Sequence, residues 1–201
     1  MPYLLRLSLP DVPGSLGRVA SAIGEAGGDI EAIEIVEKRY DGTAVDDVFL
    51  EMVGGAMPDQ IVSACTDLDG VEVLWISRYA GGGNLFLDLE AVEEMTTDPE
   101  RAYDLFVDLL PDVFRSDWGA RVGAEGIRHA TSAAPGELAQ PPVGGVERIE
   151  AVDTELRVAA RLDADEVVVL GRRGGPEFLD SELARLEHLA NLARSIRARA
   201  S

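Results

Sequence analysis

The sequence of 201 residues has little of what many catalytic and binding sites require. It contains one cysteine and two histidines, which excludes an intramolecular disulfide framework and a cysteine-rich zinc or iron–sulfur site. Basic residues number 18 against 37 acidic ones, giving a net charge of −19. Such a charge argues against binding to nucleic acid or to acidic membrane surfaces, because phosphate contacts need clustered Lys and Arg. We interpret it as a determinant of solubility.

Long apolar runs and targeting signals are also missing. The longest runs, such as Val167–Leu170, fall far below the roughly 18 residues of a membrane span. Residues 1–10 lack the basic stretch followed by an apolar stretch that marks a signal peptide. We therefore expect a soluble, cytoplasmic protein with no membrane partner.

The first 80 residues alternate between strand and helix patterns. We expect strands at residues 3–9, 30–40, 43–53 and 71–75, and helices over 16–26 and 57–68. The Asp41-Gly42 pair is a hairpin signal between the second and third strands. The resulting order βαββαβ predicts a ferredoxin-like fold with both helices on one face of an antiparallel sheet.

The remainder reads as a second domain after a boundary. Three glycines, Gly81–Gly83, begin a linker that we place at residues 81–97, with a short connecting helix inside it. Residues 98–201 then form the second domain. Asp98 and Pro99 are expected to start a helix that Pro111 ends.

The interior of this second domain is less clearly patterned. Weak strands are expected at 117–123 and 126–133, a loop at 134–145 and a strong strand at 166–170, whereas 146–162 remains unassigned. Gly171–Pro176 is interpreted as a turn with solvated arginines, and Asp180 as the cap of a final helix. The whole chain is therefore predicted to be α+β.

Residues that carry catalysis are few. His129 and His188 are isolated in the sequence, and Cys65 falls on the apolar face of the predicted second helix with no base beside it. Asp46 and Asp47 are neighbours on a strand, so their side chains point to opposite faces and do not share a site. We expect no catalytic residue, no metal site and no cofactor.

The first loop is the most informative segment. Residues 11–16 join the first strand to the first helix, whose N-terminus leaves backbone N–H groups unpaired and carries partial positive charge. A carboxylate or another anion binds readily at such a terminus. Pro13 stiffens the approach, and Gly14 lets a ligand come close to the backbone.

The segment from Tyr3 to Arg78 resembles an ACT domain, a small regulatory module of amino-acid metabolism. The resemblance rests on L-S-L-P-D-V-P-G-S-L at 7–16 and I-G-E-A-G-G-D-I at 23–30. It implies that two modules pair side by side or face to face and bind an amino acid or a related effector at the interface. By position, the implied ligand-binding residues are Asp11, Val12, Pro13, Gly14, Ser15, Leu16, Asp29 and Ile30.

One of these positions departs from the family pattern. Many amino-acid-binding members carry asparagine where this chain has Asp29. A carboxylate there attracts an ammonium group and repels a ligand carboxylate, by about 4 kcal/mol at ~4 Å and an effective dielectric constant near 20.

The second domain is similar to a GAF-type domain, through a last strand with its turn at 166–173 and an F-x-x-x-E-L stretch leading into a Leu/Ala-rich helix at 178–190. The family's ligand cup is usually built from the segment that corresponds to 124–160, which is short and rich in Pro and Gly here. Methionine sulfoxide reductases of this type rely on several cysteines, and residues 98–201 contain none. The order of the two modules resembles a family of actinobacterial ACT–GAF-like proteins.

Three functions follow as hypotheses. The leading one is a non-enzymatic regulatory protein that senses a small molecule at the interface of an ACT homodimer and acts on a partner protein in trans. The alternative is a structural or regulatory interaction subunit with no ligand of its own. The third, an enzyme with a site in residues 120–160, is disfavoured by the scarcity of nucleophiles and histidines there.

Overall fold

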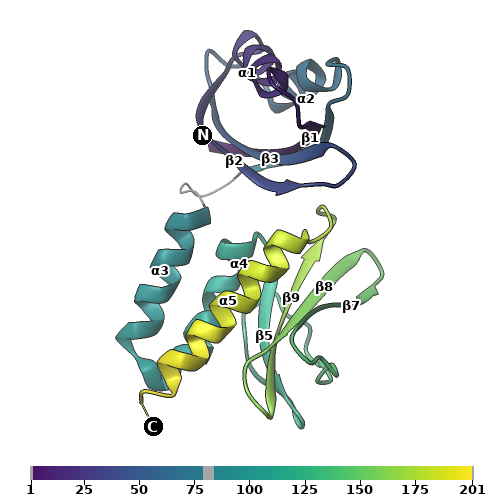
Figure 1. Ribbon diagram of the computed structural model, residues 1–201. Helices are drawn as coiled ribbons and strands as arrows, with labels where there is room; N and C mark the ends of the chain where they lie inside the picture. Colours follow the sequence, from purple (N-terminus) through teal and green to yellow (C-terminus); the bar gives the residue numbers. More distant parts are fainter. Residues whose placement is uncertain (1, 79–83, 201) are drawn as a thin grey trace. The chain divides into compact units, whose positions relative to one another are not determined.

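The computed structural model describes residues 2–78 and 84–200. The chain divides into two compact units, Met1–Gly83 and Asn84–Ser201, and each is considered by itself (Figure 1). The expected boundary at Gly81–Gly83 lies outside the described residues.

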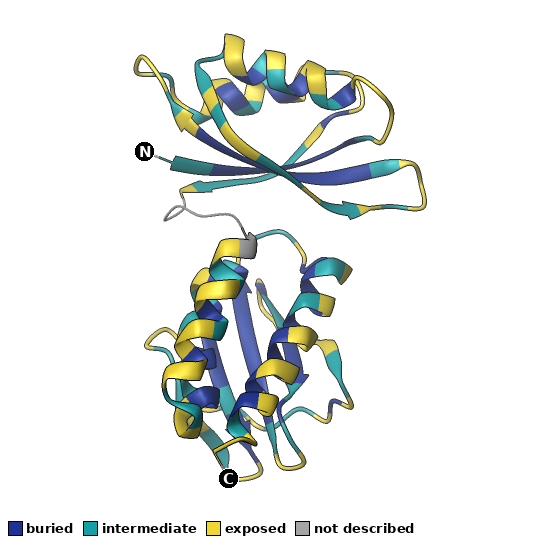
Figure 2. Cartoon of the chain, turned by 60° about the vertical axis from the view of Figure 1, so that its left-hand side comes forward, coloured by how far each residue is buried: buried dark blue, intermediate teal, exposed yellow. Residues whose placement is uncertain are grey.

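The first unit has the predicted βαββαβ order. Its elements are β1 (Pro2–Pro10), α1 (Ser15–Glu25), β2 (Gly28–Lys38), β3 (Thr43–Met52), α2 (Pro58–Thr66) and β4 (Glu72–Arg78). All neighbouring strands are antiparallel, in the sheet order β2-β3-β1-β4. Both helices cover one face of the sheet (Figure 2). The prediction of a ferredoxin-like first domain is confirmed.

Helix α1 lies on the sheet through one buried stripe. Ser15, Val19 and Ile23 recur every four residues and are its buried positions, as expected for one face of a helix. Close packing at the far end depends on Gly28, because a Cβ atom there would lie 2.6 Å from Cγ2 of Ile23. The stripe therefore fixes how α1 runs over the sheet.

The register of β1 and β3 decides which side chains α1 covers. Leu5 pairs with Val48, and Leu7 pairs with Asp46. Directly opposed residues of an antiparallel pair point to the same face, and Leu5, Leu7 and Val48 belong to the core beneath the helices. Asp46 consequently points to the helix-covered face as well.

The second unit combines one antiparallel sheet with helices. Its elements are α3 (Asn84–Thr97), a 3₁₀ turn (Pro99–Arg101), α4 (Ala102–Phe114), β5 (Trp118–Gly123), β6 (Gly126–Ala130), β7 (Val146–Val152), β8 (Glu155–Arg161), β9 (Glu166–Arg173) and α5 (Asp180–Arg197). The sheet order is β6-β5-β9-β8-β7. The three α-helices share a core with one face of this sheet, through residues such as Met95, Phe106 and Leu186.

The opposite face of that sheet is covered by the chain between β6 and β7. Val143 is buried there, and Ala134 and Leu138 pack against the same cluster as Trp118 and Val169. The Pro/Gly-rich segment therefore fills this face with its own side chains.

Several expectations for the second unit were wrong in detail. The connecting helix expected within residues 81–97 is present as α3, and Ala91 and Met95 of that helix lie in the core. Pro111 lies inside α4, which continues to Phe114 because Val113 and Phe114 are buried. Strand β9 continues through Arg173, where a turn was expected.

The start of the last helix also differs from the expectation. Leu179, not Asp180, is the N-cap of α5. The backbone N–H of Leu179 donates to Oε2 of Glu182 at 2.8 Å. Glu182 therefore takes the role expected of Asp180, satisfying a backbone donor at the helix start.

Candidate functional site

The β1–α1 loop is held by short backbone hydrogen bonds. The N–H of Asp11 donates to the carbonyl of Gly42 at 2.9 Å, and the N–H of Ser15 donates to that of Val12 at 3.2 Å. Gly14 is the N-cap residue, with φ of 93°, a conformation that favours glycine. A Cβ atom on Gly14 would meet nothing within 4 Å. The space beside the Gly14 backbone is thus open.

No side chain caps helix α1. Its N-cap residue, Gly14, makes no side-chain cap hydrogen bond, and the first turn contains no acidic residue. Uncapped N–H groups and the helix dipole together make such a terminus favourable for a negatively charged group. The loop is therefore suited to hold the anionic end of a small ligand.

A lysine that the sequence reasoning missed lies beside this loop. Nζ of Lys38, the last residue of β2, is 2.9 Å and 3.1 Å from the carboxylate oxygens of Asp11. Both side chains are solvent-exposed, so the pair contributes little stability. It joins the loop to the end of the edge strand.

The implied ligand-binding residues fall into two groups that one chain does not bring together. Residues 11–16 follow the C-terminal end of β1, where Pro10 pairs with Thr43. Asp29 pairs with Glu51, which in turn pairs with Pro2 at the start of β1. The two groups therefore lie at opposite ends of the sheet, about 27 Å apart at roughly 3.4 Å per residue.

Asp46 is a second residue that the sequence reasoning passed over. Its side chain does point away from that of Asp47, as predicted, but it is only 2% exposed. Its Oδ1 atom has no hydrogen-bond partner among the described residues. Burial raises the pKa of Asp46, as do the carboxylates of Asp11 and Asp47, against the opposing effect of Lys38.

The signal for Asp46 was present in the sequence. Two acidic residues interrupt the run A-V-D-D-V-F-L at 44–50, whose other residues are apolar. Asp47 on the other face is paired with Arg6, with distances of 2.7 Å and 2.9 Å. Burying an acidic side chain in a central strand is therefore unfavourable unless a cation or hydrogen-bond donors compensate its charge.

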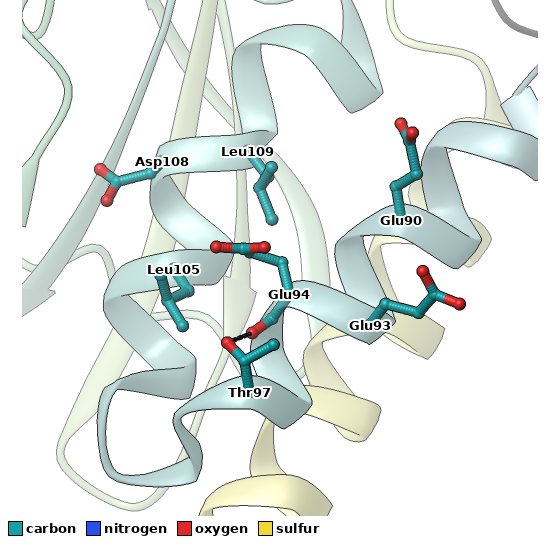
Figure 3. A pocket seen from close by; sticks show the side chains of 7 residues that line it. All are labelled: Glu90, Glu93, Glu94, Thr97, Leu105, Asp108 and Leu109. Carbon is teal, nitrogen blue, oxygen red and sulfur yellow. Dashed lines mark hydrogen bonds between the residues drawn. The ribbon is translucent and has the colours of Figure 1, made fainter.

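The second unit carries a groove between α3 and α4. It has a volume of about 600 Å³ and is lined by Glu90, Glu93, Glu94, Thr97, Leu105, Asp108 and Leu109 (Figure 3). Asp108 also contacts Nε2 of His129 at 2.7 Å. The lining combines carboxylates with two leucines and contains no cysteine, serine or lysine.

Arg172 corrects the expectation of solvated arginines. Its side chain is buried, and Nη2 donates to the carbonyl of Phe114 at 2.6 Å and to Oε1 of Glu182 at 2.9 Å. The guanidinium also stacks on the ring of Phe178 at 3.9 Å. Arg172 is therefore a structural residue that joins β9 to α4 and α5.

Glu155 lies in a second ionic cluster. Its Oε2 accepts from Nε1 of the buried Trp118 at 3.0 Å and from Arg173 at 2.7 Å, and its Oε1 accepts from Arg157 at 2.7 Å. Burial raises the pKa of Glu155, but these donors outweigh burial and lower it overall.

The other reactive side chains among the described residues are not arranged as a nucleophilic or metal-binding site. Cys65 is buried, and burial raises its pKa to about 11, which keeps it protonated and weakly nucleophilic. Within residues 2–78 and 84–200, no three His, Cys, Asp or Glu side chains come together in a way that could hold a metal ion. In the same ranges, no helix is both long and apolar enough to cross a membrane.

Residues 3–68 match the family model of the ACT domain. The first unit is thus an ACT domain, in agreement with its loop motif and its βαββαβ order. No curated protein matches the chain significantly.

Solved structures resemble the chain at low identity. The GAF domain of an Acinetobacter phosphoenolpyruvate-protein phosphotransferase is 12% identical, covers 60% of this chain and 96% of its own, and has a TM-score of 0.47. The free methionine-R-sulfoxide reductase of Neisseria meningitidis, solved with its substrate, is 8% identical over 62% and 98%, with a TM-score of 0.48.

A protein from Galdieria sulphuraria is similar along almost the whole chain. It is 11% identical, covers 98% of this chain and 92% of its own, and has a TM-score of 0.35. These likenesses transfer no activity, because the identities and TM-scores are low.

Proposed function

We propose that this protein is a non-enzymatic regulator whose ACT domain binds a small-molecule effector at the β1–α1 loop. The observation that carries the proposal is the uncapped N-terminus of α1 behind an accessible Gly14. ACT and GAF-like domains are typically small-molecule-sensing modules. The effector is an amino acid or a related compound.

A second copy of the chain completes the site. Strand β2 is at the edge of the sheet, and Lys38 at its end contacts the loop through Asp11. Antiparallel pairing of two β2 strands about a twofold axis would bring the loop of one copy beside Asp29 and Ile30 of the other. Two equivalent sites at the dimer interface follow from this arrangement.

The response is passed to a partner protein in trans. Allostery requires two states with different ligand contacts, and a site shared by two copies provides them, since the effector stabilises the paired state. The competing proposal is an interaction subunit without a ligand, favoured by the acidic groove between α3 and α4.

Thermal unfolding in the presence of metabolites separates these two proposals. An effector at 100 times its Kd adds about 2.7 kcal/mol. The melting temperature should therefore rise by roughly 5–10 °C for a chain of this size. A panel of amino acids, nucleotides and common metabolites that leaves the folded protein unshifted would support the subunit without a ligand.

A glycine pair provides the matched control. Gly14→Leu places a side chain in the open space at the N-cap and should abolish the shift. Gly174→Leu in the second unit carries the same conformational penalty, since its φ is 63° and a Cβ there also meets nothing within 4 Å. A shift lost equally in both variants would indicate general destabilisation.

The dimer is tested through an exposed apolar residue on each edge strand. Ile35 on β2 is 54% exposed, and Val152 on β7 is 46% exposed. Ile35→Glu should convert the dimer to a monomer in light scattering coupled to size exclusion, whereas Val152→Glu should not. A wild-type monomer at micromolar concentration contradicts the shared site.

A further inference from the structure

Two polar side chains beneath the first turn of α1 lack hydrogen-bond partners. Ser15 is 3% exposed and its Oγ atom has none among the described residues, and the same holds for Oδ1 of Asp46. Buried polar atoms are nearly always hydrogen-bonded, so each exception requires an explanation. The first unit has three such atoms among its described residues; the third, Oε2 of Glu37, belongs to a carboxylate whose other oxygen accepts from Arg39.

The packing of α1 places Ser15 within one helical step of the level of Asp46 along the sheet. Ile23 lies against Gly28, which pairs with Met52 at the end of β3. One step of four residues along the helix spans about the same length as two residues of strand. Moving back by two such steps, from Ile23 through Val19 to Ser15, follows β3 from Met52 through Leu50 to Val48. Ser15 therefore lies one step from the level of Asp46.

The charges around Asp46 are compensated unequally. Asp11 has Lys38, which approaches both of its carboxylate oxygens. Asp47 has Arg6 in a bidentate pair. Asp46 forms no ion pair with either cation among the described residues, and the effect of Lys38 on it is opposed by burial and by both neighbouring carboxylates. A buried carboxylate without its own cation is unfavourable unless another group supplies the positive charge.

The loop that precedes the first turn of α1 is open to solvent. Val12, Pro13 and Gly14 are exposed, and the space beside Gly14 is open. Backbone hydrogen bonds and the exposed Asp11–Lys38 pair hold the loop. A ligand can approach the backbone of the loop from solvent, beside the residues that Asp46 interacts with electrostatically.

We propose that Asp46 is the specificity-determining residue of the effector site, accepting hydrogen bonds from a protonated primary amine of the effector, with Ser15 Oγ as a second acceptor. This inference rests on the proposed function and specifies the chemistry of its ligand. The amine supplies the charge that Asp46 lacks, while the uncapped turn of α1 binds the effector's anionic end. Asp29 of a second copy adds another negative group near the same site.

The first test compares matched ligands on the wild-type full-length protein. Common amino acids and their 2-hydroxy-acid analogues, which replace the ammonium by a hydroxyl, are titrated by calorimetry and thermal shift. Loss of a charge-assisted hydrogen bond weakens binding by about 10- to 100-fold. We expect amino acids to bind and their hydroxy acids to bind at least tenfold more weakly. Equal binding of both overturns the role of Asp46 but leaves the proposed function intact.

The second test uses Asp46→Asn, which preserves shape and removes the charge. Affinity for the amino acid should fall by about 10- to 100-fold, whereas affinity for the hydroxy acid should change by less than about threefold. Ser15→Ala should give a smaller loss of the same selectivity. Unchanged affinity of Asp46→Asn for the amino acid contradicts the inference. If no compound of either series binds the wild type, the proposed function fails together with it.

Discussion

The two units bury charged side chains in contrasting ways. In the second unit, Arg172 and Glu182 face each other and Glu155 accepts from three donors. In the first unit, Arg6 and Asp47 are paired, but Oδ1 of Asp46 on the opposite face has no hydrogen-bond partner among the described residues. The paired charges hold the structure together. For the incompletely paired Asp46 we have proposed a role in ligand binding.

Removing the central arginine of the second unit should have the largest effect. Arg172→Met leaves Glu182 buried without its partner, and breaking a buried pair costs about 3–5 kcal/mol. The second unit should therefore melt roughly 6–20 °C lower. Arg128→Met, at an exposed position of β6 where the side chain pairs with the exposed Glu125, is the control and should cost less than about 1 kcal/mol. Equal effects would mean that the burial of Arg172 is unimportant.

A glycine beneath a tryptophan gives the next largest effect. A Cβ atom on Gly171 would lie 2.3 Å from the ring of the buried Trp118. Gly171→Ala should destabilise the second unit by about 1–3 kcal/mol in urea unfolding. Gly123→Ala meets only the side chain of Arg128 at 3.1 Å, which can move, so this variant should remain near wild type.

Removing the charge of Asp46 should raise the stability of the first unit, whereas the two preceding substitutions lower that of the second unit. Asp46→Asn removes a buried, unpaired charge, so we expect the first unit to gain about 1–2 kcal/mol at pH 7 without ligand. The measurement is unfolding followed by Trp75 fluorescence in a Trp118→Phe background. A loss of stability would show that the Asp46 carboxylate is already satisfied.

The pH dependence of the two units should also be opposite. The raised pKa of Asp46 means that its favourable contribution is complete below about pH 4 and is lost as pH rises through the raised value. The lowered pKa of Glu155 means that its contribution is present above about pH 4.5 and is lost as pH falls. Acidification from pH 6 should therefore weaken the second unit first in unit-resolved hydrogen exchange. Parallel loss in both units would contradict the contrast.

The smallest expected effect concerns Cys65. Its buried thiol has a pKa of about 11, so thiol reagents at pH 8 should label it only when the first unit opens. Labelling should become fast in denaturant. Rapid labelling of the native protein would contradict the burial of the Cys65 side chain on α2.

The predictable part of the molecule is the part with regular apolar spacing. All six elements of the first unit follow from such patterns, and Asp41-Gly42 marks its hairpin correctly. Strand β7 was not predicted because it is an edge strand with mostly exposed residues, including Glu147, Arg148 and Glu150. Its polar sequence carries no alternation to detect.

The candidate site was predictable only in part. The loop motif located Gly14 and the helix N-terminus from local sequence alone. Lys38 and Asp46 reach the loop through strand pairing, which places residues distant in sequence side by side. The burial of Arg172 has the same origin, because its partners come from α4 and α5. Contacts of this kind depend on tertiary packing, which residue spacing does not encode.

Glu182 has a consequence for how the chain folds during its synthesis. One oxygen of this carboxylate satisfies the start of α5, and the other holds Arg172 of β9. Until residue 182 has left the ribosome, the arginine has no carboxylate to meet, and the core lacks Leu186, Leu189 and Ile196. The second unit therefore closes late, whereas the first unit needs nothing beyond β4 and is able to fold while the rest is still being made.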